Sequence, residues 1–296
     1  QDHITRIERY LDAVRSTLLF AKGVLLVEGD AEQILIPEMF TSVFGVSLDE
    51  IGISLVNIGS TGFKNIARLF HQDRIQRNCA IITDQDTSVL PLEDELFGDT
   101  PEEKACRASE KKGLERKADL EKFIKDNDHI NLFFADYTFE VDFLKNGNQY
   151  EIKACISSVY NNAKKVDEIT KSVDDSSVAV FGPAVLEMAN YKGKGWFALL
   201  LAEHLNYNTY VPKYILQAIA YSSAHINDQA LSAMAIYRLN KIIKNTSEDQ
   251  AFRDRAAELK KDYRAKVKAI EPMKGFLDNY KAEFKNDQLT VFLNLL

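Results

Sequence analysis

Residues 23–32 (GVLLVEGDAE) decide the fold, because a short apolar run ends in acidic residues and a helical pattern follows at once. Residues 24–27 are continuously hydrophobic, which is typical of a strand that is buried on both faces of a parallel sheet. Over residues 31–44 apolar side chains recur at three- and four-residue intervals, and this spacing predicts a helix that ends at Gly45. The chain therefore places acidic side chains where a strand passes into a helix.

The same order of elements recurs twice downstream. Residues 53–58 predict a second strand, residues 59–62 (GSTG) a turn and residues 63–71 a helix. Residues 79–83 predict a third buried strand, which ends on the sequence Asp-Gln-Asp. Strands that alternate with helices indicate βαβ units, whose ligands bind beyond the carboxyl ends of the strands. We therefore expect an α/β fold, with a Rossmann-like parallel sheet flanked by helices and an additional, mostly helical domain.

Four carboxylates are predicted to lie at that edge of the sheet. Glu28 leaves the first strand and Glu32 lies in the first turn of the next helix, whereas the Asp84–Asp86 pair is expected to project from one side of an extended strand end. Such a group would repel itself unless cations neutralised it. Oxygen ligands suit Mg²⁺ or Mn²⁺, and two ions roughly 4 Å apart can activate water and stabilise a leaving oxygen in phosphodiester cleavage.

Each acidic motif also has an ordinary explanation. An acidic residue in the first helical turn favours the helix dipole, and an Asp-x-Asp sequence is a common turn. The occurrence of both motifs within about sixty residues, separated by a strand, a glycine turn and a helix, favours the metal site over these explanations.

Composition limits the class of protein. The chain has 296 residues and a net charge of -7, with the acidic excess before residue 221 and a slightly basic region after it. No apolar run is long enough to cross a membrane, the first residues do not resemble a signal peptide, and three cysteines without CxxC spacing indicate neither a disulfide framework nor a zinc ribbon. We therefore expect a cytoplasmic protein, although the charge alone also fits an ordinary acidic protein.

Three segments resemble the opening motifs of the toprim domain, as found in nucleases of the overcoming-lysogenization-defect (OLD) family: LLVEGDAEQILIPEMF (25–40), NIGSTGFKNIARLF (57–70) and AIITDQD (80–86). The resemblance returns at residues 137–143, 192–205 and 211–219. It implies a Mg²⁺- or Mn²⁺-dependent DNA endonuclease or nickase that uses two ions and serves phage defence. It also implies an N-terminal ATPase part, and the start of the sequence inside a periodic pattern suggests a fragment of a longer protein.

The resemblance also implies roles for individual residues. Catalysis would involve Glu28, Asp84, Asp86 and Lys194, with Lys194 supplying positive charge to the scissile phosphate. The implied metal ligands are Glu28, Glu32, Asp84, Asp86 and Glu140. Substrate contacts are implied for Gly59, Ser60, Thr61 and Lys194, with Gly62 also allowing close approach of the backbone. Glu140 and Lys194 could instead be solvated surface residues, and the glycines could simply serve the turn.

Four regions are expected along the chain. Residues 1–22 would form an opening helix, 23–145 the toprim catalytic core, 146–220 a helical segment that returns Lys194 to the site, and 221–296 a C-terminal helical region. Trp196 is expected in the core. A homo-oligomer is possible.

Other functions stay open or are disfavoured. The main alternative is a non-catalytic toprim-fold module that binds nucleic acid or a nucleotide and supports assembly. A haloacid-dehalogenase type of phosphoryl site would need a nucleophilic Asp where Glu28 stands, and the chain has no GxxxxGK[ST] phosphate loop. The sequence leaves open whether the substrate is DNA or RNA and whether cleavage gives a nick or a double-strand break.

Overall fold

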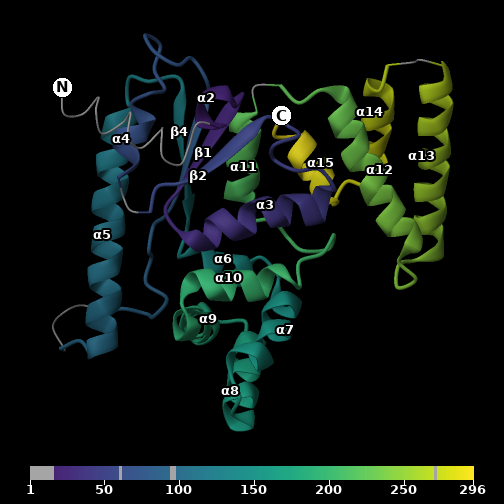
Figure 1. Ribbon diagram of the computed structural model, residues 1–296. Coiled ribbons are helices and arrows are strands. Elements are labelled where there is room, and N and C mark those ends of the chain that lie inside the picture. Colours follow the sequence, from purple (N-terminus) through teal and green to yellow (C-terminus); the bar gives the residue numbers. More distant parts are fainter. Residues whose placement is uncertain (1–16, 60–61, 94–97, 224, 270–271) are drawn as a thin grey trace.

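A parallel sheet forms the centre of the molecule, as the sequence predicts, and it has four strands (Figure 1). The computed structural model describes residues 17–59, 62–93, 98–223, 225–269 and 272–296. The strands lie in the order β2-β1-β3-β4. Their bounds are β1 (Gly23–Val27), β2 (Ile53–Asn57), β3 (Cys79–Asp84) and β4 (Ile130–Ala135).

Helices cover both faces of the sheet, which explains why its strands are continuously hydrophobic. Leu25 and Val27 belong to the larger core, and Val24 and Leu26 alternate to the smaller one. The larger core includes residues of α3 (Asp30–Phe44) and α11 (Lys213–Ser222). The smaller core includes residues of α2 (Thr17–Phe20), α4 (Phe63–Ala67) and α5 (Pro101–Ile124). The remainder of the expected opening helix, residues 1–16, lies outside the described residues.

The rest of the chain is helical. Below α3 in Figure 1 lie α6 (Phe139–Lys145), α7 (Gln149–Val159), α8 (Ala163–Val173), α9 (Val178–Lys192) and α10 (Lys194–Ala202). On the side opposite α5 stand α12 (Asp228–Lys244), α13 (Gln250–Ala269) and α14 (Lys274–Glu283), while α15 (Gln288–Leu293) lies nearer the sheet. Buried residues of α12, α14 and α15 belong to the same core as α3. Among the described residues, no helix combines the length and apolarity needed to cross a membrane.

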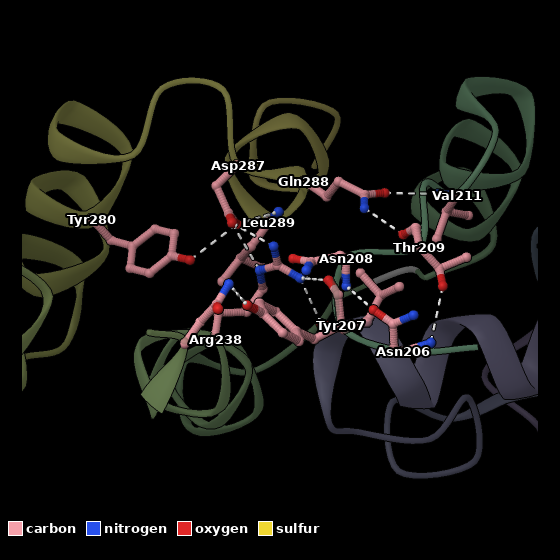
Figure 2. Close-up of polar contacts among 12 residues, drawn as sticks. Asn206, Tyr207, Asn208, Thr209, Val211, Arg238, Tyr280, Asp287, Gln288 and Leu289 are labelled. Carbon is pink, nitrogen blue, oxygen red and sulfur yellow. Dashed lines mark hydrogen bonds and ion pairs between the residues drawn. The ribbon is translucent and has the colours of Figure 1, made fainter. Parts of the chain in front are cut away.

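A buried ion pair fastens the C-terminal helices to α3 (Figure 2). The guanidinium of Arg238 on α12 donates two hydrogen bonds to Asp287 Oδ2, of 2.8 and 2.6 Å. It also donates to the carbonyl oxygens of Val43 (3.0 Å) and Tyr207 (2.6 Å). The hydroxyl of Tyr280 donates to Asp287 Oδ1 at 3.0 Å. This charge pair is therefore balanced and hydrogen-bonded from several elements at once.

Helix α11 runs antiparallel to the strands. Its last turn lies at their amino ends, since the Ser222 hydroxyl donates to the Val24 carbonyl (3.0 Å) and the Asn78 amide donates to the Tyr221 carbonyl (2.7 Å). The helix packs along β1, β3 and β4. Ten helical residues span about 15 Å, which is the length of a short strand, so the first turn of α11, with Tyr214, lies at the carboxyl edge of the sheet.

Candidate functional site

The predicted carboxylates lie at the carboxyl edge of the sheet but divide between its two faces. Side chains alternate along a strand, so Asp84 follows Ile82 towards the larger core. Thr83 points to the other face, where its hydroxyl donates to Glu28 Oε2 at 3.1 Å. Two groups of charged residues result, one beside α3 and α11 and the other beside α5.

The first group gathers Glu32, Asp84, Glu140 and Lys194, and we call it the acidic cluster. Glu140 is only 1% exposed, which excludes the solvated alternative for this residue. The ammonium of Lys194 lies 3.2 Å from each oxygen of the Glu140 carboxylate, and the Thr138 hydroxyl donates to Oε2 at 2.9 Å. The structure thus brings residues 140 and 194 together although they are far apart in the sequence.

Negative charge exceeds positive charge in the acidic cluster, and the protonation equilibria reflect this. Burial raises the pKa of Glu32 to about 7, with the charges of Glu140 and Glu28 adding to the effect. Burial, followed by the charges of Glu32 and Glu140, raises the pKa of Asp84 well above its usual range. Burial by itself would lower the pKa of Lys194, but Glu140 and Asp84 outweigh it and raise that pKa. Three carboxylates share one ammonium, and an additional cation would relieve their repulsion.

The second group is held by Arg116 of α5. Its guanidinium donates to Asp86 Oδ2 at 2.7 Å and to the Asp84 carbonyl at 2.5 Å, and it lies 3.8 Å from Glu28 Oε2. Asp86 follows the end of β3 with a φ of 55°, so the expected extended Asp84–Asp86 pair is wrong: the chain turns there and the two carboxylates diverge.

Two glycines allow other parts of the chain to approach the carboxyl edge of the sheet closely. A Cβ on Gly113 would lie 1.9 Å from the Gln85 carbonyl oxygen, so only glycine lets α5 press against the Asp-Gln-Asp turn. A Cβ on Gly29 would lie 2.9 Å from Glu32 Oε2, which shows that the Glu32 carboxylate folds back over this glycine. The two glycines allow α5 and the Glu32 side chain to lie directly against the edge of the sheet.

The glycine turn after β2 supports the start of α3. The Asn57 amide donates to Asp30 Oδ1 (2.8 Å) and Gln33 Oε1 (3.0 Å). Gly59 has a φ of 68°, which favours glycine, and its N–H donates to Asn57 Oδ1 at 2.7 Å. That N–H is therefore already engaged within the turn. Ser60 and Thr61, the other predicted phosphate contacts, lie outside the described residues.

The donor chemistry of the acidic cluster fits a hard divalent cation. Its potential metal ligands are carboxylate oxygens, which Mg²⁺ and Mn²⁺ prefer. One of them, Glu140 Oε1, is buried and accepts no hydrogen bond from the described part of the chain. Within the described ranges, however, no three His, Cys, Asp or Glu residues are already gathered in a geometry that could hold a metal ion. Lys194 and Arg116 pair with the carboxylates instead, so cation binding would require side chains to rearrange.

Several residues of this edge were not expected from the sequence. Arg116 lies in a segment that reads as a charged surface helix, and only the glycine at position 113 hinted at a close contact. Tyr214 lies within the segment 211–219 that resembles the OLD family. The expectation that Trp196 belongs to the core is wrong: it is 55% exposed, because the adjacent Phe197 fills the buried position of α10.

Comparisons with known proteins concern the domain and its fold. Residues 19–86 match the family model described as "Overcoming lysogenization defect protein-like, TOPRIM domain". The structure is similar to the C-terminal region of the Burkholderia pseudomallei OLD protein, with a TM-score of 0.50 and 26% identity over 68% of this chain and 96% of that chain. It also matches the C-terminal region of the Xanthomonas campestris pv. campestris OLD protein, with a TM-score of 0.49 and 20% identity over 76% of this chain and 99% of that chain. No curated protein matches the sequence.

The chain therefore carries a TOPRIM domain, built on the parallel sheet and its acidic edge. This domain is of the OLD-like type. An OLD-like TOPRIM domain suggests a nuclease-type function, and TOPRIM domains generally bind divalent metals.

Proposed function

We propose that this chain is a divalent-metal-dependent nuclease that cleaves phosphodiester bonds of DNA, with Mg²⁺ or Mn²⁺ as its ions. The observation that carries the proposal is the acidic cluster, in which the buried Glu32 and Glu140 and the partly buried Asp84 share a single lysine. A buried excess of negative charge destabilises the fold, so its presence favours a functional role. It is the arrangement expected of a site that binds cations.

The residues proposed to hold two ions are Glu28, Glu32, Asp84, Asp86 and Glu140. Bound cations would supply Lewis acidity, which activates water and offsets charge on the phosphate. Glu32, whose pKa is about 7, must release any proton it carries when a cation enters. Arg116 must likewise release Asp86 if that carboxylate is to become a ligand.

Lys194 is proposed to contact the phosphate. Its side chain is 45% exposed, although its ammonium pairs with the buried Glu140, so it links solvent to the acidic cluster. A cation that neutralised Glu140 would free the ammonium for an incoming phosphate oxygen. A positive charge fixed next to the reacting phosphate stabilises the charge that develops in the transition state.

The wider setting follows the same proposal. We infer that the chain acts in the cytoplasm, next to an N-terminal ATPase part of the same protein, in defence against phage. Ser60, Thr61 and the Gly59 turn stay proposed as neighbours of the substrate backbone. We also propose that the chain assembles into a homo-oligomer.

Plasmid cleavage tests the proposal. Supercoiled plasmid is incubated with the chain in Mg²⁺, Mn²⁺ or Ca²⁺, and nicked and linear products are separated on a gel. We expect cleavage in Mn²⁺ or Mg²⁺, and a reduction of at least about 100-fold for Asp84→Asn.

The matched control is Asp136→Asn, since Asp136 follows β4 at the same edge but is 65% exposed and pairs with Lys145. Its cleavage rate should stay within about twofold of the wild type, given the small effect of exposed ion pairs. Equal activity of Asp84→Asn and the wild type would show that the site is wrongly assigned. No cleavage under any metal would favour the non-catalytic binding module.

A further inference from the structure

Tyr214 places a buried hydroxyl at this edge without a hydrogen-bond partner. The side-chain oxygen is shielded from solvent and accepts or donates no hydrogen bond within the described part of the chain. Buried polar atoms are almost always paired, because an unpaired one forfeits the hydrogen bonds it made in water. An unpaired buried hydroxyl next to a candidate binding site suggests that its hydrogen-bond partner enters with the ligand.

The position of Tyr214 follows from the direction of α11. The last turn of that helix lies at the amino ends of the strands, so its first turn lies at their carboxyl ends, on the face of the acidic cluster. Tyr214 is the second residue of this helix. It thus stands on the same side of the sheet as Asp84 and Glu32.

The charges around Tyr214 decide what its hydroxyl can do. Burial, together with the charges of Asp84, Asp142 and Glu32, raises its pKa well above the usual range, so it keeps its proton at neutral pH. It can therefore donate a hydrogen bond. Two of the nearby acceptor atoms already have partners: Asp142 Oδ2 accepts from the Tyr137 N–H at 3.3 Å, and Glu140 Oε2 accepts from Lys194 and Thr138.

We propose that Tyr214 is a positioning residue of the loaded site, whose hydroxyl donates a hydrogen bond to an oxygen atom that enters the acidic cluster together with a divalent cation. The inference rests on the cation binding proposed above. The oxygen belongs either to a water of the cation or to a phosphate of the nucleic acid, since both are acceptors of the same kind. The aromatic ring meanwhile packs against the larger core and fixes the direction of the hydroxyl.

Tyr214→Phe tests this role, because it removes the hydroxyl and keeps the ring. Tyr221→Phe is the matched control: it lies on the same helix at the opposite end, where its hydroxyl donates to the Asp128 carbonyl at 3.1 Å. The melting temperature is measured without metal, and Mn²⁺ binding is measured by calorimetry. Binding of a short duplex DNA is then measured in Ca²⁺.

We expect the metal-free melting temperature of Tyr214→Phe to equal or exceed that of the wild type, because the lost hydroxyl made no hydrogen bond. Mn²⁺ affinity should fall about tenfold if the acceptor is a water of the cation. DNA affinity should fall by a similar factor, with Mn²⁺ affinity unchanged, if the acceptor is a phosphate oxygen. Tyr221→Phe should leave both affinities unchanged.

Two results would overturn the inference. One is unchanged affinity for both Mn²⁺ and DNA in Tyr214→Phe. The other is a metal-free melting temperature several degrees below the wild type, which would mark an ordinary structural hydroxyl. Because these readouts measure binding, they test Tyr214 even if the wild-type chain cleaves no DNA and the proposed nuclease function fails.

Discussion

The acidic cluster and the Arg238–Asp287 pair both bury charge, but they treat it in opposite ways. Asp287 accepts hydrogen bonds from Arg238 and Tyr280, and the remaining donors of Arg238 reach two backbone carbonyls. The acidic cluster instead holds Glu32, Asp84 and Glu140 against one ammonium. One group of charges is balanced within the chain, and the other has room for a further positive charge.

This difference distinguishes charges that stabilise the fold from charges that serve a function. A balanced, fully hydrogen-bonded pair can hold α3, α12 and α15 in place without any ligand. An unbalanced cluster destabilises the protein that contains it, so its presence needs a reason outside folding. Perturbed pKa values alone do not distinguish the two, since burial and neighbouring charges shift groups in both, including Tyr280 in the balanced one. The sign of the net charge does distinguish them.

The largest effect is expected when the balanced pair is broken. Arg238→Ala would leave Asp287 buried without its cation and two carbonyls without their donor, and should lower the free energy of unfolding by about 3–5 kcal/mol. Urea unfolding followed by circular dichroism measures this loss. The matched control is Arg255→Ala, because its guanidinium is 48% exposed and lies 3.7 Å from Glu283. The control should lose at most about 1 kcal/mol. Equal losses in the two variants would mean that the buried pair stabilises the fold no more than an exposed pair does.

A smaller effect is expected from pH, and Glu32 of the acidic cluster should contribute to it. The folded protein holds the Glu32 proton up to about pH 7, whereas the unfolded chain releases it near 4.5. The stabilisation from this raised pKa is therefore complete below pH 4.5 and is lost as pH rises to 7. We expect a loss on the order of 3 kcal/mol from this group over that window without divalent metal.

Metal addition sharpens the pH prediction. Mn²⁺ should raise the melting temperature more at pH 8 than at pH 5, because protons and cations compete for the same carboxylates. Thermal unfolding at both pH values, with Glu32→Gln as the control, measures this. A metal-induced shift that was independent of pH, or that survived intact in Glu32→Gln, would remove Glu32 from the cation site.

The sequence predicts the sheet well because the information is local. β1 and β3 are short apolar runs that lead directly into acidic residues, and the burial of both their faces favours a parallel sheet. The edge that bears Glu28, Glu32 and Asp84 follows from the same rule. Lys194 and Glu140 could be added only by resemblance, because 54 residues and several helices separate them.

What the sequence does not predict depends on packing between distant elements. In the sequence, Arg116 is one of many charged residues on α5. Only the structure shows that Gly113 lets this helix lie against the Asp-Gln-Asp turn. The positive φ of Asp86 then turns its carboxylate away from Asp84. The division of the carboxylates between two faces is thus a property of the tertiary structure. Likewise, no local pattern marks Arg238 and Asp287, 49 residues apart, as a pair.

The smallest predicted change in stability is a gain, and its sign is what matters. Asp84→Asn keeps the shape of the side chain and removes one negative charge from the acidic cluster, so the metal-free protein should become more stable by about 1 kcal/mol. Asp136→Asn, at the exposed end of β4, should change the stability by less than about 0.5 kcal/mol. Urea unfolding in EDTA measures both variants. A loss of stability in Asp84→Asn would show that Asp84 is balanced within the chain, as Asp287 is. A gain that disappears when Mn²⁺ is added would show that the carboxylate is kept for the cation and not for the fold.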